Sequence, residues 1–297
     1  MTELYPPAVG GSAVLLENVY RRVEAAVEVV TDPVTSPGPE GERGGLTVRH
    51  APIRSDRWGL LDPRAFRRSV ALASRVRRER GEVHCARAIP EGLAALLSRL
   101  AGGPAYAVWA HGEDVATALA SRELSILQKA VYRGARAVLA NSRNTARMVE
   151  GLGVPGGRIT VVHPGVDAAR FHPGVDGRRV RERYGLDGES VLLTVGRLQR
   201  RKGHDLVLSA LARLDGVRWL VAGEGEERPR LERLAAELGV ADRVVFAGTV
   251  PSEDLPAFYG ACDVFVHPNR VDGRDVEGFG IVFLEAAACA RPAIGGD

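Results

Sequence analysis

The sequence predicts an α/β protein with two doubly wound parallel sheets, each covered by helices on both faces. Short apolar runs alternate with amphipathic segments along nearly the whole chain, and this rhythm restarts after residue 169. The strands of a parallel sheet are buried on both faces and therefore read as continuous apolar runs. The 297 residues are enough for two domains of ordinary size.

The first half, residues 1–168, is predicted to be one Rossmann-like domain. Its expected strands are "EAAVEVVTD", "LTVRHAPI", "EVHCARA", "AYAVWAHG", "RAVLANS" and "RITVVHPGVD", with a Pro/Gly-rich loop between the first two. Its expected helices are a basic helix at residues 63–79, "PEGLAALLSRL", "SRELSILQKAVYRGA" and "RNTARMVEGLG". In "PPAVGGSA", Gly10 and Gly11 precede a further helix, for which Ser12 is the expected N-cap.

The second half, residues 169–297, is predicted to be a second Rossmann-like domain, joined to the first near Ala169 to Gly185. Its strands and helices should alternate as "SVLLTVG", "GHDLVLSALARL", "VRWLVAG", "ERPRLERLAAELG", "DRVVFAG", "SEDLPAFYGA" and "DVFVHP". A last helix is expected from about Gly280 to Ala290, since "IVFLEAAACA" is too long and too Ala-rich for a strand.

Composition excludes several classes of function. The net charge of +3 does not indicate nucleic-acid binding. The three cysteines, Cys85, Cys262 and Cys289, lack metal-like spacing, which fits a reduced cytosolic protein without disulfides. No apolar run reaches the length of a membrane span, and the sequence predicts no signal peptide. Without a D-x-D, an H-E-x-x-H or a His/Cys cluster, no metal site is predicted.

Glu285 lies in the middle of the apolar last helix, one turn after Ile281. A buried carboxylate costs several kcal/mol, roughly, unless it is paired or hydrogen-bonded, so Glu285 needs donors from the fold or from a ligand. The N–H groups of Phe279, Gly280 and Ile281 would lie at the helix N-terminus, which suits a phosphate. A nucleotide would fit both features, with its phosphate at the helix N-terminus and its hydroxyl groups at Glu285, one turn further along. The alternative is a helix with one polar edge and no ligand.

Basic and imidazole side chains follow several strands. In "TVGRLQRRKGHD", Arg197 and Lys202 can reach a ligand at the strand end, or the segment is a solvated basic turn. His111 ends "VWAH", where it can bind a ligand or serve the fold. Gly248 ends "VFAG", where backbone can touch a base. These positions agree with the rule that ligands bind beyond the carboxyl ends of parallel strands.

The basic helix "PRAFRRSVALASRVRRER" sets seven arginines beside Phe66, Val70, Ala73 and Val76. This pattern is compatible with contact with an anionic membrane surface. The alternative is the outer face of an ordinary domain helix in an Arg-rich sequence.

Together these segments resemble the retaining glycosyltransferases of the GT-B fold, family 4, group 1. The resemblance rests on "YPPAVGGSAVLL", "AHGED", "ANSRNT", "HPGVDAARFHP", "TVGRLQRRKGHD", "VAGEGEERPRLERLA", "RVVFAGTV", "ACDVFVHPNR" and "VEGFGIVFLEAAAC". Within the family, "DVEGFGIVFLEA" is most similar to mannosyltransferases that extend phosphatidylinositol mannosides from GDP-mannose. The resemblance implies two Rossmann-like domains facing across a cleft, the first for the acceptor and the second for the nucleotide sugar.

The resemblance also implies roles. Gly196, Arg197 and Lys202 would bind the donor diphosphate, and Glu285 would accept the ribose hydroxyls. Glu277 would contact the transferred sugar, and Phe279, Gly280 and Ile281 would offer backbone N–H groups to sugar or phosphate. Gly11 would let the donor phosphate approach, and His111 would position the sugar near its anomeric carbon. The activity implied is a metal-independent, cytoplasmic hexosyltransferase that retains configuration, uses GDP-mannose or a UDP-sugar and needs no cofactor. Its acceptor would be a glycan or glycolipid.

Two departures from the family pattern stand out. Ala290 occupies a position where the family usually has Gly. Relative to the family pattern, the first strand and the end of the second domain are missing, so the sequence predicts a fragment. The alternatives are a nucleotide-sugar epimerase or hydrolase of the same fold, and a truncated paralogue that binds nucleotide sugar without turnover.

Overall fold

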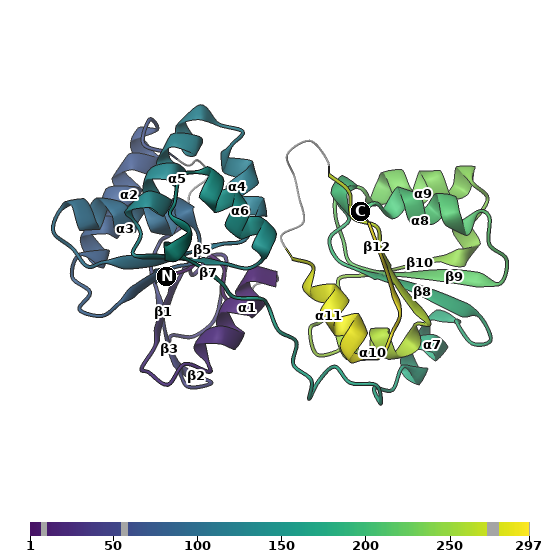
Figure 1. The fold of residues 1–297 in the computed structure, drawn as a ribbon. Helices are drawn as coiled ribbons and strands as arrows, with labels where there is room; N and C mark the ends of the chain where they lie inside the picture. Colours follow the sequence, from purple (N-terminus) through teal and green to yellow (C-terminus); the bar gives the residue numbers. More distant parts are fainter. Residues whose placement is uncertain (7–10, 55–58, 272–278, 297) are drawn as a thin grey trace. The chain divides into compact units, whose positions relative to one another are not determined.

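A computed structural model describes residues 1–6, 11–54, 59–271 and 279–296 of the chain. Within-chain contacts divide it into two compact units, Met1–Pro164 and Gly165–Asp297. The division falls close to the boundary predicted after residue 168. Each unit is an α/β layer structure around its own parallel sheet (Figure 1).

Unit 1 contains a four-stranded parallel sheet in the order β4-β5-β6-β7 and a three-stranded sheet in the order β1-β3-β2. The strands are β1 (Glu28–Thr31), β2 (Gly41–Arg43), β3 (Leu46–His50), β4 (Val83–Cys85), β5 (Tyr106–Ala110), β6 (Ala137–Ala140) and β7 (Ile159–Val161). The first two residues link the two sheets. Met1 bonds to β4 through the carbonyl of His84 at 2.6 Å, and the Thr2 N–H donates to Val30 of β1 at 2.9 Å. Glu3 is thereby placed beyond the carboxyl ends of these strands.

The helices of unit 1 cover both faces of the β4–β7 sheet. They are α1 (Gly11–Tyr20), α2 (Pro63–Val76), the helical turn η1 (Ala88–Gly92), α3 (Leu93–Leu100), α4 (Glu113–Ala118), α5 (Arg122–Gly134), α6 (Arg143–Gly151) and the turn η2 (Gly156–Arg158). Strand β5 shows why both faces are covered, since its side chains alternate. Val108 packs in the cluster with α3 and α5, whereas Trp109 packs against Leu15 and Leu16 of α1.

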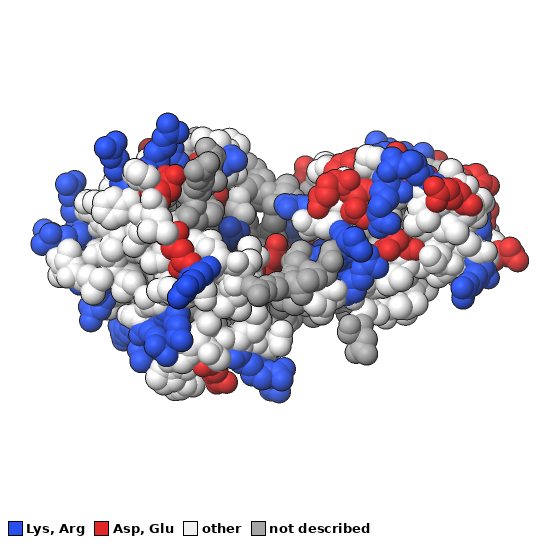
Figure 2. All heavy atoms as spheres, turned by 90° about the horizontal axis from the view of Figure 1, so that it is seen from above, with Lys and Arg blue, Asp and Glu red and all other residues white. Residues whose placement is uncertain are grey.

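Helix α2 is the predicted basic helix. Asp62 caps it by accepting from the N–H groups of Arg64 and Ala65, and its inner side buries Leu72 and Val76. Its outer side is solvated, with Phe66 46% and Val70 42% exposed. Figure 2 shows basic side chains standing out from the outer part of unit 1. Within the described ranges, no helix is both long enough and apolar enough to cross a bilayer.

Unit 2 has one five-stranded parallel sheet in the order β10-β9-β8-β11-β12. Its strands are β8 (Ser190–Val195), β9 (Val217–Ala222), β10 (Val244–Gly248), β11 (Val264–His267) and β12 (Ala293–Gly295). Its helices are α7 (Arg178–Tyr184), α8 (His204–Leu211), α9 (Arg228–Glu237), α10 (Leu255–Ala261) and α11 (Ile281–Ala288), with the turns η3 (Arg200–Lys202) and η4 (Ala241–Arg243).

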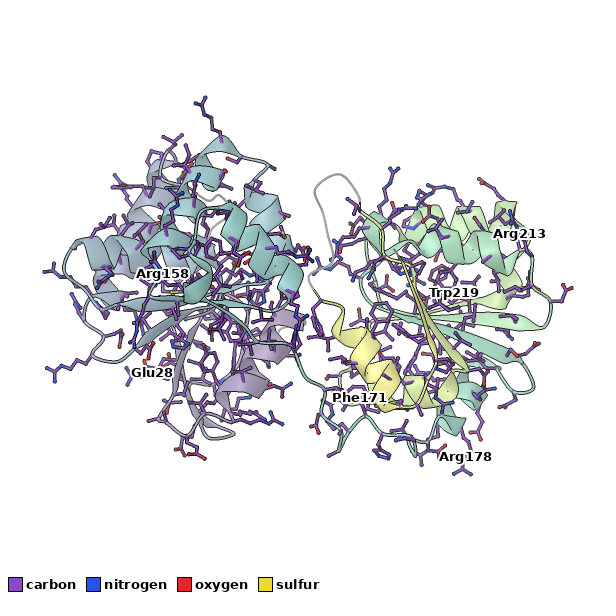
Figure 3. All side chains as sticks on the ribbon, viewed as in Figure 1. Glu28, Arg158, Phe171, Arg178, Arg213 and Trp219 are labelled. Carbon is purple, nitrogen blue, oxygen red and sulfur yellow. The ribbon has the colours of Figure 1, made fainter. Side chains whose placement is uncertain are left out.

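The core of unit 2 lies on both faces of its sheet. On β9, Trp219 and Val221 face the cluster formed with α8 and α9, whereas Leu220 faces the cluster formed with α10 and α11. Trp219, labelled in Figure 3, is fully buried, and its indole N–H donates to the Thr194 hydroxyl at 2.9 Å. This bond matters because an unpaired indole N–H in a core would be costly.

Three local expectations were wrong. The predicted Pro/Gly-rich loop contains β2, which pairs antiparallel with β3. The predicted joining segment 169–185 contains α7, whose Val180 packs in the core of unit 2. Ser12 is not an N-cap, because α1 already begins at Gly11. All three depend on where neighbouring elements pack, which local composition does not encode.

Candidate functional site

Several of the predicted site residues lie at or just beyond the carboxyl ends of parallel strands. In unit 2, Gly196 follows β8, Gly248 ends β10, and the basic turn runs on from Gly196. In unit 1, His111 follows β5. Gly11 and His111 belong to unit 1, and the other described site residues belong to unit 2. Glu277 lies outside the described residues, so its role stays a prediction.

The basic turn of unit 2 is built into the fold. Arg197 is exposed, but Lys202, in the 3-10 turn η3, is only 8% exposed. Gly203 then starts α8 with a positive φ of +68°, and a Cβ there would lie 2.0 Å from the carbonyl oxygen of Pro268. The Arg270 N–H donates to the Arg201 carbonyl at 2.8 Å, so the turn docks against the loop after β11. The alternative of a freely solvated turn therefore fails for Lys202.

Two buried imidazoles stand beside this turn, and sequence reasoning missed both. His267 is fully buried, and its ring stacks on Phe265 with centroids 5.8 Å apart. Burial, together with the nearby charge of Lys202, lowers the pKa of His204 to about 4. Burial, followed by Lys202, His204 and Arg201, also holds the pKa of His267 well below its usual range. Both rings are therefore neutral at pH 7, and the positive charge here belongs to Arg and Lys.

His267 links the basic turn to the last helix. A Cβ added to Gly196 would lie 3.3 Å from Cε1 of His267, so the imidazole stands directly behind the backbone at that position. The same ring meets Phe283 of α11 edge-on, with centroids 5.8 Å apart. Gly196, the basic turn and α11 therefore form one contiguous region.

Helix α11 carries Glu285 as predicted, although it spans Ile281–Ala288 and is shorter than expected. Gly280 is its N-cap in the left-handed region, with φ +80° and ψ +59°, a conformation that favours glycine. The fold itself supplies one donor to Glu285, because the Tyr259 hydroxyl donates to Oε2 at 2.6 Å. Burial nevertheless raises the pKa of Glu285, while Tyr259 and Arg170 act in the opposite direction. Tyr259, in "FYGA", was not singled out from the sequence.

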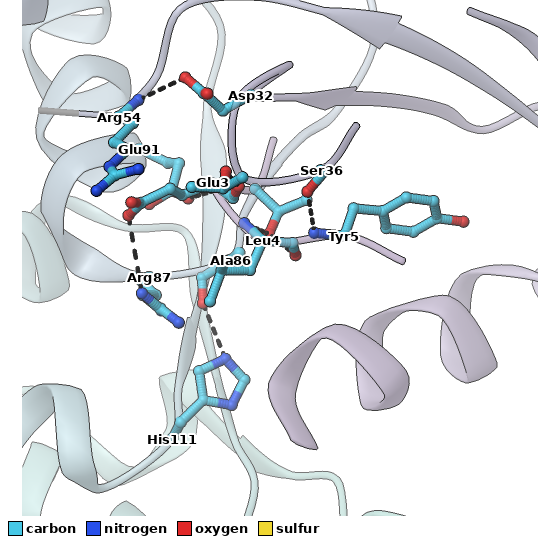
Figure 4. Close-up of polar contacts among 12 residues, drawn as sticks. Glu3, Leu4, Tyr5, Asp32, Ser36, Arg54, Ala86, Arg87, Glu91 and His111 are labelled. Atoms are coloured by element: carbon cyan, nitrogen blue, oxygen red, sulfur yellow. Dashed lines mark hydrogen bonds and ion pairs between the residues drawn. The ribbon is translucent and has the colours of Figure 1, made fainter. Parts of the chain in front are cut away.

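His111 is held firmly in unit 1. Its Nε2 lies 2.9 Å from the Ala86 carbonyl oxygen, which can only accept, so this nitrogen carries a proton (Figure 4). Its backbone N–H donates to Asp114, and its carbonyl accepts from Asn141. Burial lowers the pKa of His111, Asp114 opposes this effect, and Arg87 adds to it. The neutral imidazole is thus fixed in one tautomer beyond the end of β5.

Three charged residues near His111 were also missed. Glu3, Arg87 and Glu91 lie at the same edge of unit 1 and come from two separate segments of the sequence. "ARAIPEG" contains no recognisable motif, and only folding brings its Arg and Glu to Glu3. Among the described residues, no group of three or more His, Cys, Asp or Glu side chains is arranged to hold a metal ion. All three cysteines are free and buried.

Comparison with known families matches both units. The sequence model of Glycosyltransferase Family 4 matches residues 9–170, and that of the glycosyl transferases group 1 matches residues 177–297. A GDP-mannose-dependent alpha-(1-6)-phosphatidylinositol monomannoside mannosyltransferase of Mycolicibacterium smegmatis is 37% identical over 238 residues, covering 76% of this chain and 62% of that protein. Its Mycobacterium tuberculosis counterpart is 36% identical, covering 71% of this chain and 56% of that protein. The chain thus spans less than two thirds of the length of these relatives.

Solved structures agree on the fold. Anabaena HepE, solved with UDP and glucose, superposes with a TM-score of 0.79 at 17% identity, covering 99% of this chain and 79% of HepE. Sucrose-phosphate synthase from Thermosynechococcus elongatus has a TM-score of 0.78 at 21% identity, covering 97% of this chain and 76% of that one. The two Rossmann-like units are those of the GT-B fold, and the chain belongs to Glycosyltransferase Family 4.

Proposed function

We propose that this protein transfers a hexose from a nucleoside-diphosphate sugar to a glycan or glycolipid acceptor, with retention of anomeric configuration. The observation that carries the proposal is the strand-end edge of unit 2. There Lys202, Gly196 and helix α11 surround His267, and Glu285 lies one turn into the helix. Cationic groups and a helix N-terminus suit a diphosphate, and a carboxylate one turn on suits ribose hydroxyls.

The proposed roles follow this geometry. Arg197 and Lys202 bind the diphosphate and stabilise the charge that develops on the leaving group. The N–H groups of Phe279, Gly280 and Ile281 contribute at the start of α11, and Gly248 lets the backbone approach the base. For Gly11 and His111 of unit 1, the proposed roles are close approach of the donor phosphate and positioning of the sugar. Glu277 is proposed to contact the transferred sugar. Since protein cations neutralise the leaving group, we propose that catalysis needs no metal ion and no cofactor.

The donor is proposed to be GDP-mannose or a UDP-sugar. The mannosyltransferase relatives are named for GDP-mannose, and HepE was solved with UDP and glucose. A thermal melt of the 297-residue chain with GDP, UDP and ADP in turn decides the base. A ligand that binds only the folded state raises the melting temperature by mass action. At 100 times its Kd, the ligand adds about 2.7 kcal/mol to the free energy of unfolding. A cooperative melt that none of the three shifts would contradict the proposal.

Activity is tested with the donor chosen by that melt and methyl α-D-mannopyranoside as acceptor, with and without EDTA. We expect a product of retained configuration by NMR and an unchanged rate in EDTA. Donor consumption at the same rate without acceptor would favour a hydrolase or epimerase. Saturable nucleotide binding without any donor consumption would favour a non-catalytic paralogue.

We propose further that α2 contacts an anionic membrane surface at the cytoplasmic face. The support is its exposed Phe66 and Val70 beside the exposed Arg67 and Arg68. Apolar and basic groups together favour such a surface. The wild type should sediment with phosphatidylserine vesicles but not with phosphatidylcholine vesicles. The double variant Arg67→Glu/Arg68→Glu should no longer sediment with phosphatidylserine vesicles. Equal sedimentation of both proteins would refute the contact.

A further inference from the structure

Glu3, Arg87 and Glu91 form a charged cluster at the carboxyl edge of the unit 1 sheet, here called the Glu3–Arg87 cluster. Nη1 of Arg87 lies 3.8 Å from Oε2 of Glu3. Oε1 of Glu91 accepts from the backbone N–H of Glu3 at 2.5 Å. Figure 4 shows the three residues converging from the loops after Thr2 and after β4.

Hydrogen bonds and burial hold the backbone of the cluster in place. Glu91 is fully buried in η1, and its Oε2 has no hydrogen-bond partner within the described part of the chain. The Thr35 hydroxyl donates to the Glu3 carbonyl, and the Ser36 hydroxyl accepts from the Tyr5 N–H at 2.7 Å. The backbone around Glu3 is therefore fixed, while 14% of the Glu3 side chain and 28% of the Arg87 side chain remain exposed. Both side chains can therefore still contact a ligand.

The cluster adjoins the predicted catalytic imidazole. His111 bonds to the carbonyl of Ala86, the residue before Arg87, and Arg87 is close enough to help lower the pKa of His111. In Figure 4 the Arg87 side chain lies between the Glu3 carboxylate and the His111 ring. A molecule bound at the cluster would therefore sit beside His111.

The charges of the cluster nearly cancel. Arg87 faces two carboxyl groups, those of Glu3 and Glu91, and burial raises the pKa of Glu91 to about 7 while Arg87 and the amino terminus oppose this. Burial raises the pKa of Glu3 and Arg87 opposes this, while the weaker effects of Asp32 and Arg54 act in opposite directions. The Asp32 carboxylate is already engaged by the N–H groups of Ile53 and Arg54, at 2.7 and 2.8 Å. A phosphate site needs uncompensated cations, and the described residues of this edge do not supply them.

A paired carboxylate and guanidinium instead offer acceptors and a fork of donors side by side. Neighbouring hydroxyl groups both donate and accept, so this pair complements a vicinal diol. We propose that Glu3 and Arg87 bind neighbouring hydroxyls of an uncharged ring polyol in the acceptor, and that Glu91 positions Glu3. The inference rests on the proposed function, because it assigns the acceptor-binding group of the same transferase.

The test measures binding of methyl α-D-mannopyranoside and of mannose 6-phosphate to the 297-residue chain by saturation-transfer NMR titration. The wild type should bind the uncharged glycoside at least as tightly as the phosphate. Glu3→Gln, which keeps the shape of the side chain, and Arg87→Gln, which removes the guanidinium, should each weaken glycoside binding about tenfold. The matched control is Glu28→Gln, which removes another Arg–Glu pair of unit 1, with Arg49 at 3.2 Å (Figure 3). Glu28→Gln should leave the affinity for the glycoside unchanged.

Arg87→Lys keeps the charge but loses the planar fork, and it should weaken the glycoside as much as Arg87→Gln. This second variant carries the test if Arg87→Gln unfolds. Tighter binding of the phosphate, no glycoside binding by the wild type, or unchanged binding in the Glu3 and Arg87 variants would overturn the inference. Nucleotide binding is measured on the same samples, so its absence would reject the transferase function separately from the polyol site.

Discussion

The strand-end edges of the two units differ in the balance of their charged side chains. In unit 2, Arg197, Arg201 and Lys202 follow β8, and the neighbouring His204 and His267 are held neutral. In unit 1, Arg87 is balanced by the carboxyl groups of Glu3 and Glu91. The first arrangement suits an anionic ligand, and the second suits an uncharged one. The same architecture can thus present a diphosphate site at one edge and a polyol site at the other.

The two units also differ in how they satisfy a carboxyl group that is shielded from water. Glu285 receives a side-chain hydroxyl from Tyr259 on α10, whereas Glu91 receives a backbone N–H from Glu3. A hydroxyl can rotate away when a ligand offers its own hydroxyls, but a backbone N–H is fixed by the fold. We therefore expect Glu285 to act on a ligand directly and Glu91 to act only through Glu3.

The largest effect should follow Lys202→Ala. A charge-assisted contact contributes about 1.5–3 kcal/mol, so the affinity for the nucleoside diphosphate should fall about 100-fold, measured by calorimetry. The affinity for methyl α-D-mannopyranoside should not change, because that site lies in unit 1. Arg213→Ala, on an exposed residue labelled in Figure 3, is the control. Equal diphosphate affinity in Lys202→Ala and wild type would remove the charge contrast between the two edges.

A second effect concerns stability and pH. A carboxyl group whose pKa is raised in the folded state binds more protons there than in the unfolded chain, so stability falls as pH rises from about 4.5 to about 7. Between pH 5 and 8, the wild type should lose about 2 kcal/mol more unfolding free energy than Glu91→Gln, by urea denaturation.

Glu42→Gln, in the exposed strand β2, should keep the pH dependence of the wild type. Parallel pH profiles for Glu91→Gln and the wild type would mean that Glu91 does not titrate in this range. An unshifted Glu91 would be ionised at pH 7, and the Glu3–Arg87 cluster would then carry a net negative charge.

A third, smaller effect tests Glu285. Tyr259→Phe removes the hydroxyl donor and should lower the unfolding free energy at pH 7 by about 1 kcal/mol. It should also raise the pKa of Glu285 further, since Tyr259 now lowers it. Tyr184→Phe is the control, because its hydroxyl bonds to no residue in the described part of the chain, and it should be nearly neutral. If both variants were equally stable, the fold would not be supplying the donor.

The smallest effect is expected at the end of α11. Ala290 has a φ of +55°, in the left-handed region, and Arg291 donates back to the Ala286 carbonyl at 2.9 Å. Glycine relieves this strain, so Ala290→Gly should raise the unfolding free energy by about 0.5 kcal/mol. Ala287→Gly, inside the same helix, should lower it by about the same amount. If Ala290→Gly lowered the unfolding free energy, the conformation of Ala290 would not be strained.

Much of the fold could be predicted, because strands such as "VRWLVAG" and helices such as "SRELSILQKAVYRGA" carry their periodicity in the local sequence. Strand β2 and helix α7 could not, since one is defined by its pairing with β3 and the other by its packing on α10. The placement of Lys202 at a strand end was predictable, but its burial beside two imidazoles was not. The Glu3–Arg87 cluster left no signal at all, as its members are up to 88 residues apart in sequence.

The sequence by itself determined the two α/β units, the helix that carries Glu285 and the strand-end positions of His111, Arg197 and Lys202. These follow from periodicity and from the rule that parallel strands direct their carboxyl ends to one edge. Tertiary structure alone decided the protonation of the side chains at those edges and the partners of Glu91 and Glu285. Burial and nearby charge set a pKa, and both depend on which distant segments fold against the residue.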